Sequence, residues 1–182
     1  PNLNKKIFEP LNERICLMHI RSGDEFITKN NCTHPIYVLP PLAYYKKIID
    51  EYDDVYDKFI IMTEPDLLNP CIQPLKEYSN KVEIRCNSAN EDFVYFLRAQ
   101  SIVLSWSTFS DIVVYLSPNL KNLFFWNDSH VFSDKSVLPK NLNVKSLILT
   151  KPYIERGKWN GLDKNIHKKM VEYKVEDVIF ET

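Results

Sequence analysis

Short apolar runs alternate along this chain with longer segments of mixed character. Five of the runs are expected to form strands, namely 14–20, 58–62, 81–86, 101–106 and 122–126. Most of them are apolar at every position rather than at every second position. Because continuous apolar character is typical of strands that are buried on both faces, the pattern predicts a parallel sheet.

The segments between these runs begin with residues that favour helix starts. Asn69 followed by Pro70 fits a cap with proline at the first helical position, and Ser88 with Glu91 fits a capping box. Pro40-Pro41 precedes another helix-like segment, and a further helix is expected over 108–116. Strands and helices that alternate at this spacing predict a doubly wound, mostly parallel α/β sheet with right-handed crossovers.

The pattern is looser after residue 127. Residues 146–150 are expected to form one more strand, and 162–174 a closing helix. Between them, 151–161 is predicted to be a loop. Trp159 in this loop is expected to act as an anchor, and the alternative is that it stacks on a base or sugar.

The composition of the 182 residues suits one packed domain, since 45% are hydrophobic. The expected domain covers 1–182, with its core at about 14–126 and an extension over 127–182. The 23 basic residues are balanced by 24 acidic ones, so no positive field indicates a nucleic-acid partner. No apolar run approaches the roughly 20 residues of a membrane span. The compartment is left open.

A polar cluster, HIRSGD at 19–24, follows the first predicted strand. His19 and Arg21 are two positions apart, so on an extended chain they point to the same face. The planar fork of Arg21 suits a phosphate group, to which His19 can also donate. Gly23 allows a sharp turn, and Asp24 can orient Arg21, accept a ribose hydroxyl or take a proton. The residues alone equally allow a plain Arg21–Asp24 ion pair.

A second polar cluster, SWSTFSD at 105–111, opens the helix after the fourth strand. Helix N-termini bind anions through free N–H groups and the helix dipole. Helix capping alone explains one or two of the four hydroxyl side chains there. Two anion-friendly strand ends in one sheet favour a diphosphate ligand, because a diphosphate needs donors from more than one side.

These segments resemble the donor-binding half of the α1,2/α1,6/protein O-fucosyltransferase superfamily, and most closely its α1,2-fucosyltransferase-like members. The likeness rests on H-x-R-x-G-D at 19–24, the loop from His34-Pro35 to Pro40-Pro41, the acidic helix start at Glu91-Asp92 and S-T-F-S at 107–110, and it covers about 14–126. It implies the C-terminal, Rossmann-like half of a GT-B-type glycosyltransferase. The implied reaction is metal-independent, inverting transfer of fucose from GDP-fucose to a glycan or glycoconjugate acceptor.

The resemblance also implies roles for individual residues. Arg21 and His19 would hold the diphosphate, Asp92 would contact the nucleoside, and 107–109 would line the phosphate and sugar end. The implied donor-binding residues are His19, Arg21, Ser22, Gly23, Asp92, Ser107, Thr108 and Phe109. Many relatives carry a second arginine where Ser22 stands and aromatic residues where this chain has Asp111-Ile112.

The implied chemistry needs no metal, because Arg21 can stabilise the charge that develops on the β-phosphate. No D-x-D motif or C-x-x-C spacing indicates a metal cofactor. The candidate catalytic residues are Arg21 and Asp24. The general base is expected to be a carboxylate, either that of Asp24 or that of Glu25. The acceptor-binding domain is expected upstream in a longer parent chain. Two alternatives stay open: another nucleotide sugar as donor, and a non-catalytic module that binds a nucleotide sugar or a glycan.

Overall fold

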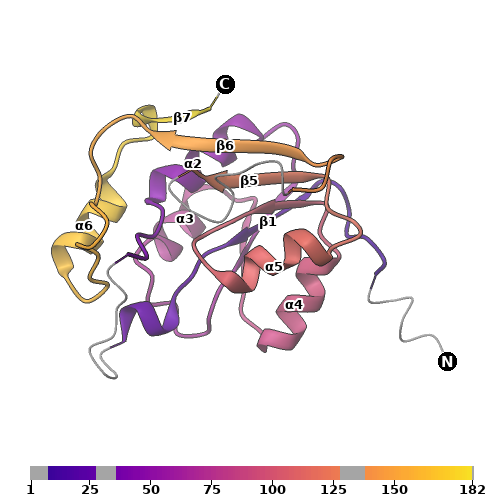
Figure 1. Cartoon of the computed structure of the whole chain (residues 1–182), viewed down its shortest axis with the longest axis horizontal. Coiled ribbons are helices and arrows are strands. Elements are labelled where there is room, and N and C mark those ends of the chain that lie inside the picture. The colour runs from indigo at the N-terminus through magenta and orange to yellow at the C-terminus, as the bar shows by residue number, and fades with distance from the viewer. Residues whose placement is uncertain (1–7, 28–35, 128–137, 182) are drawn as a thin grey trace.

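Seven strands form one sheet in the computed structural model, which describes residues 8–27, 36–127 and 138–181 (Figure 1). The strands are β1 (Ile15–His19), β2 (Lys58–Met62), β3 (Val82–Arg85), β4 (Ser101–Val103), β5 (Asn122–Trp126), β6 (Asn143–Leu149) and β7 (Val178–Phe180). Their order is β3-β2-β1-β4-β5-β6-β7. Strands β1 to β6 are parallel, and β7 is antiparallel to β6. The predicted Rossmann-like α/β fold is confirmed, with its switch point between β1 and β4.

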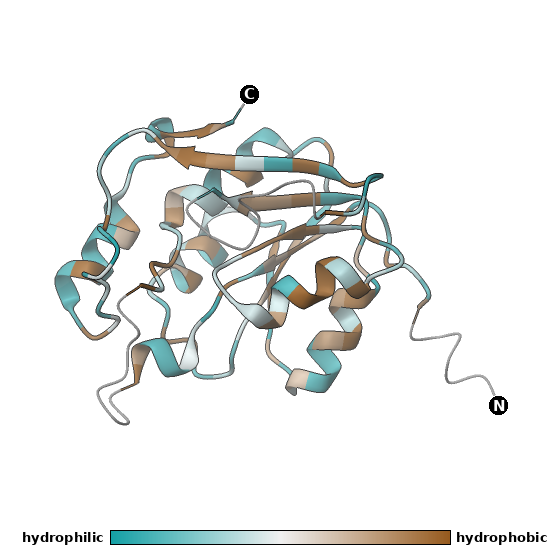
Figure 2. Cartoon of the chain, viewed as in Figure 1, coloured by the Kyte–Doolittle hydropathy of each residue, from teal (hydrophilic) through white to brown (hydrophobic). Residues whose placement is uncertain are grey.

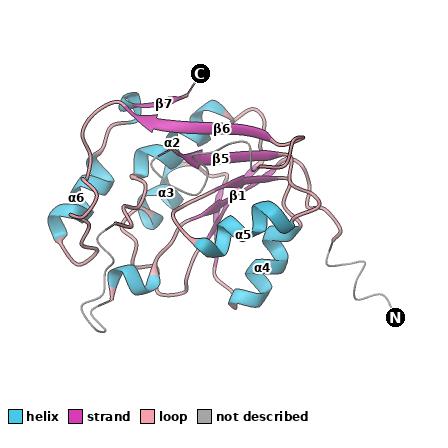
Figure 3. Cartoon of the chain, viewed as in Figure 1, coloured by secondary structure: helices cyan, strands magenta, loops and turns pink. Residues whose placement is uncertain are grey.

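Helices cover both faces of the sheet (Figure 3). The helices are α2 (Leu42–Glu51), α3 (Ile72–Tyr78), α4 (Ala89–Leu97), α5 (Thr108–Leu116) and α6 (Lys164–Glu172), with short 3-10 turns at η1 (Gly23–Phe26) and η4 (Val175–Asp177). The buried hydrophobic residues of α2, α3 and α6 belong to one cluster, and those of α4 and α5 belong to another. None of the helices in the described ranges is long and apolar enough to cross a membrane.

The alternation of side chains along β1 separates these two cores. Cys16 and Met18 pack into the cluster under α2, whereas Leu17 packs into the cluster under α4 and α5. Both faces are thus buried, which explains why the strand is apolar throughout. Figure 2 shows the same hydrophobic character along β5. By this alternation, His19 faces the α4 and α5 side, where the site described below lies.

The helix starts agree with the sequence in part. Helix α5 has the predicted bounds, and the capping box of α4 is confirmed, with the Ser88 backbone N–H donating to Glu91 at 3.1 Å. The prediction that a helix begins at Pro70 is wrong, because α3 begins at Ile72. The Asn69 side chain accepts from the N–H of Cys71 at 2.9 Å, and this turn delays α3 until Ile72.

The strand ends differ more. Strand β4 stops at Val103 rather than continuing to 106, because the chain leaves the sheet there to form the N-terminal end of α5. Strand β6 begins at Asn143, three residues before the predicted 146, since its first half is polar and pairs along β5. Strand β7 was not predicted, because three residues at a sheet edge leave little pattern in the sequence.

Replacing Ser88 with alanine is expected to lower the free energy of unfolding by about 1 kcal/mol, because the box satisfies two free N–H groups of α4. Urea unfolding of Ser88→Ala and of the matched Ser88→Thr, which keeps the hydroxyl, checks this. Equal stability of the two variants would contradict the capping role.

Candidate functional site

A pocket of about 250 Å³ lies at the carboxyl ends of β1, β2, β3 and β4. It is lined by His19, Met62, Thr63, Glu64, Pro65, Asn87, Ala89, Asp92, Phe96, Ser107 and Phe109. Residues that are far apart in the sequence therefore share one cavity next to the topological switch point. Ligands of open α/β sheets bind at this position.

His19 forms part of the pocket wall and is almost completely buried. Its ring lies edge-on to Phe96 and tilted against Phe109, with ring centroids 5.8 and 6.0 Å apart. Burial lowers the pKa of His19 to about 3, and the charge of Arg21 adds to this shift. The imidazole is therefore neutral at physiological pH, so it can offer one donor and one acceptor but no charge.

Two buried polar atoms of the pocket residues are unsatisfied. Nδ1 of His19 and Oγ1 of Thr63 have no hydrogen-bond partner within the described ranges, although both residues are about 95% buried. Such groups normally find a partner, but both atoms are buried behind the pocket wall, so a ligand could reach them only if the side chains turned. Nearby, Asp92 Oδ1 accepts from the Asn87 amide at 2.8 Å, which fixes one carboxylate oxygen of the pocket wall.

Arg21 does not line the pocket, and the prediction that its side chain shares a face with His19 is wrong. The chain leaves the strand after His19, so the guanidinium lies among residues of the α2 side of the sheet, whereas the His19 ring meets Phe96 and Phe109.

Nη2 of Arg21 donates to both carboxylate oxygens of Asp24 at 3.2 Å and lies 3.0 Å from Oε1 of Glu25. The guanidinium also stands over the Tyr37 ring, 5.4 Å from its centroid. The Arg21–Asp24 ion pair that the sequence allowed is thus present, and a second carboxylate joins it.

The two candidate bases differ in access. The Asp24 side chain is 79% exposed, whereas that of Glu25 is 3% exposed. Glu25 is held by Arg21 on one oxygen and by the indole N–H of Trp159 on the other. Of the two, only Asp24 is open to an acceptor hydroxyl.

Ser22 and Gly23 face the loop after β2 rather than the pocket. The fully buried Ser22 donates its hydroxyl to Asp66 at 2.6 Å and its N–H to Glu64 at 2.7 Å. Gly23 adopts a φ of +61°, the left-handed conformation that glycine tolerates best. Ser22 therefore shapes the loop that carries Arg21. Glu64 and Asp66 were missed, because a polar loop after a strand gives no periodic signal.

Of the three residues predicted at the start of α5, two line the pocket and one does not. Ser107 caps the helix by accepting from the N–H of Phe109 at 3.3 Å, and both residues line the pocket. Thr108 is exposed and does not line it. His34 and Pro35, which also carry the resemblance, lie outside the described residues. Within the described ranges, no group of three or more His, Cys, Asp or Glu side chains is placed to hold a metal ion.

No protein-family model, curated protein or solved structure matches this chain. Its function must therefore be inferred from the residues of the site.

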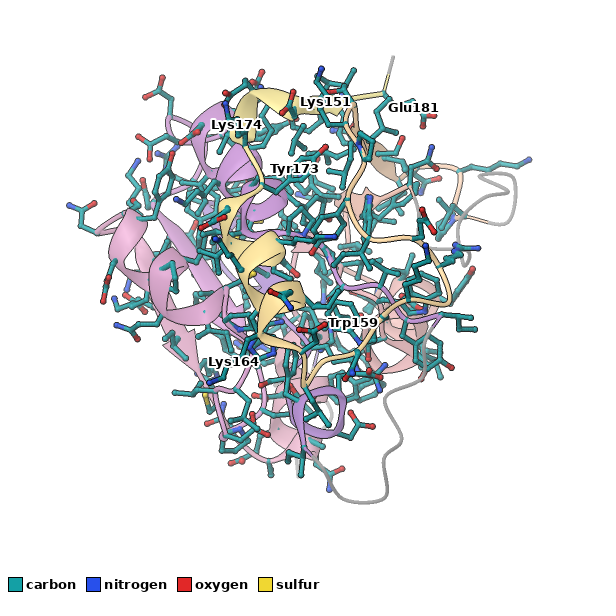
Figure 4. The ribbon with its side chains drawn as sticks, turned by 90° about the vertical axis from the view of Figure 1, so that its left-hand side faces the viewer. Lys151, Trp159, Lys164, Tyr173, Lys174 and Glu181 are labelled. Atoms are coloured by element: carbon teal, nitrogen blue, oxygen red, sulfur yellow. The ribbon has the colours of Figure 1, made fainter. Side chains whose placement is uncertain are left out.

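The C-terminal segment also reaches this region. Trp159, which is 2% exposed, anchors the loop as predicted, and Figure 4 shows it near the lower end of α6 in that view. Its indole N–H donates to Glu25 Oε2 at 3.1 Å, and its ring meets Phe26 edge-on. The contact between Trp159 and Glu25 was not predicted, because 134 positions separate the two residues.

Proposed function

We propose that this domain is the donor-binding half of a fucosyltransferase-like glycosyltransferase, which binds GDP-fucose and transfers fucose to a glycan acceptor by metal-independent inverting displacement. One observation supports this most strongly. The pocket at the switch point joins His19, Asp92 and the Ser107–Phe109 segment, three separate segments whose order resembles that of the superfamily.

The size and lining of the pocket suit the nucleoside part of the donor. A volume of about 250 Å³ lies below the roughly 300–1,000 Å³ of sites that enclose a whole drug-sized ligand. It suits a base with part of its ribose, leaving the diphosphate and sugar outside. Phe96 and Phe109 offer apolar surface to a base, and the Asp92 carboxylate can accept from the N–H groups of guanine.

The start of α5 lines the pocket through Ser107 and Phe109, and Nη1 of Arg21 lies 3.5 Å from the carbonyl oxygen of Trp106, the residue before Ser107. On this proposal, the diphosphate extends from the pocket toward Arg21. Asp24 competes for Arg21, but an ion pair with a partner that is 79% exposed contributes little stability. A phosphate can therefore displace Asp24, while the buried Glu25 continues to hold the guanidinium. Arg21 would then stabilise the charge on the leaving diphosphate, and the released Asp24 would be free to act as a base.

The acceptor would be held by a second domain of a longer parent chain. On this proposal, the 182-residue chain alone binds the donor but transfers fucose poorly, because orientation of the acceptor supplies much of the rate.

The pairing of Arg21 with two carboxylates favours a second candidate, a non-catalytic module that binds a nucleoside or nucleotide sugar without activating a diphosphate. Calorimetric titration of the chain with GDP, guanosine, ADP and UDP separates the two. The transferase proposal predicts that GDP binds more tightly than guanosine, ADP or UDP. Equal affinity for GDP and guanosine would favour the module, and no binding of any of them would contradict both.

The affinity for GDP is expected to be the same with a chelator as with added Mg²⁺ or Mn²⁺, because Arg21 and the N–H groups at the start of α5 meet the phosphate charge. Titrations in both buffers check this. Binding that appears only with a divalent cation would assign the phosphate contact to the metal instead.

A further inference from the structure

The C-terminal segment attaches to the turn η1 at the residue that holds Arg21. The carboxylate of Glu25 is shared, with Oε1 3.0 Å from Nη2 of Arg21 and Oε2 accepting from Trp159 Nε1 at 3.1 Å. All of this lies in the interior, since the side chain of Glu25 is 3% exposed and that of Arg21 is 17% exposed. One buried carboxylate thus links the arginine of the donor site to a tryptophan from the other end of the chain.

Backbone packing tightens this attachment. A Cβ at Gly161 would stand 1.7 Å from the carbonyl oxygen of Glu25, so only glycine allows the segment to lie this close. The carbonyl of Gly161 is 2.6 Å from Nε2 of His167, whose ring packs on Phe26. The segment therefore contacts both Glu25 and Phe26, and it fixes the turn from the backbone as well as from the side chain.

We propose that Trp159 is a positioning residue for Arg21, acting through Glu25, and that the C-terminal segment thereby sets the geometry of the donor phosphate site. The link to phosphate rests on the function proposed above, whereas the link between Trp159 and Arg21 does not. Without the indole N–H, the buried carboxylate of Glu25 loses one hydrogen-bond donor, which weakens the hold on its orientation. Arg21 then loses its fixed partner and the orientation that a bidentate contact with phosphate needs.

The first measurement needs no ligand. Phenylglyoxal modifies accessible arginine side chains, and peptide mass spectrometry follows Arg21 relative to Arg14, an internal reference paired with Asp57 on the surface. Trp159→Phe keeps an aromatic ring at this buried site and removes the N–H donor together with part of the indole volume, and the control below matches that loss of volume. We expect Arg21 to react several-fold faster in Trp159→Phe than in wild type. The matched control is Trp126→Phe, which changes another buried tryptophan, in β5, and should leave the rate unchanged.

The second measurement is a double-mutant cycle in GDP binding. We expect Trp159→Phe to weaken GDP binding about tenfold when Arg21 and Glu25 are present and not at all in the Arg21→Ala/Glu25→Gln background, where the buried carboxylate is neutralised together with its arginine. An equal loss in both backgrounds would mean that Trp159 acts on the pocket in general, and the proposal would be wrong.

The two measurements separate the possible failures. An unchanged Arg21 modification rate in Trp159→Phe overturns the proposal, whatever GDP does. If Arg21 is modified faster in Trp159→Phe but the wild-type chain does not bind GDP, the link between Trp159 and Arg21 is upheld. The proposed donor function is then wrong.

Discussion

GDP binding is expected to weaken by roughly ten- to a hundredfold when Arg21 is replaced by alanine and Glu25 by glutamine in the same chain, because about 1.5–3 kcal/mol of charge-assisted hydrogen bonding is lost. The second substitution is needed because Arg21→Ala alone leaves the buried carboxylate of Glu25 without its cation, which is strongly destabilising. Glutamine keeps an oxygen that can accept from Trp159. Calorimetry with GDP measures the loss in a protein that stays folded.

The matched control is Arg14→Ala, which removes another ion-paired arginine just before β1, at the end of the strand opposite the pocket. GDP affinity should be unchanged in that variant. If the Arg21→Ala/Glu25→Gln protein is folded and binds GDP as tightly as wild type, Arg21 is no part of the donor site.

The stability of the Asp111→Asn variant is expected to fall in acid much more than that of wild type. Burial raises the pKa of Asp111, in the first turn of α5, from 3.8 to about 7. The folded state therefore disfavours the charged carboxylate, and stability is lost as the pH rises from about 4 to about 7.

His19 changes the free energy of unfolding with pH in the opposite direction. With its pKa lowered from 6.5 to about 3, stability is lost as the pH falls below about 6.5.

The two effects offset each other between about pH 4 and pH 6.5 in wild type. Urea unfolding across this range should show a steeper loss toward acid in Asp111→Asn, where only His19 acts, and a gain toward acid in His19→Gln, where only Asp111 acts. Near pH 8, Asp111→Asn should be more stable than wild type by on the order of 4 kcal/mol, because the shift spans about three pKa units. Parallel profiles for all three proteins would show that neither group is shifted as described.

The sequence predicted the elements whose local signals agree. Strands β2 and β5 have the predicted bounds because they are continuously apolar, and α5 because a serine cap opens it. The predictions were wrong or missing where a side-chain turn or a short edge strand forms. The turn at Asn69 moves the start of α3 to Ile72, and the three-residue strand β7 was not predicted.

The candidate site was predicted only in part. His19, Asp92, Ser107 and Phe109 could be placed together because the ends of parallel strands meet at one edge of the sheet. The burial of Ser22 against Asp66 and the hold of Trp159 on Glu25 could not, since both depend on how distant loops pack.

On the function proposed above, the pocket between β1, α4 and α5 binds the nucleoside of a GDP-linked donor. Titration of the isotope-labelled chain with GDP, followed by amide NMR, locates the bound nucleotide. We expect saturable shifts centred on Asn87–Asp92 and Ser107–Phe109, with little change around α6. Saturable shifts that centre elsewhere, or no shifts at millimolar GDP, would contradict this proposal.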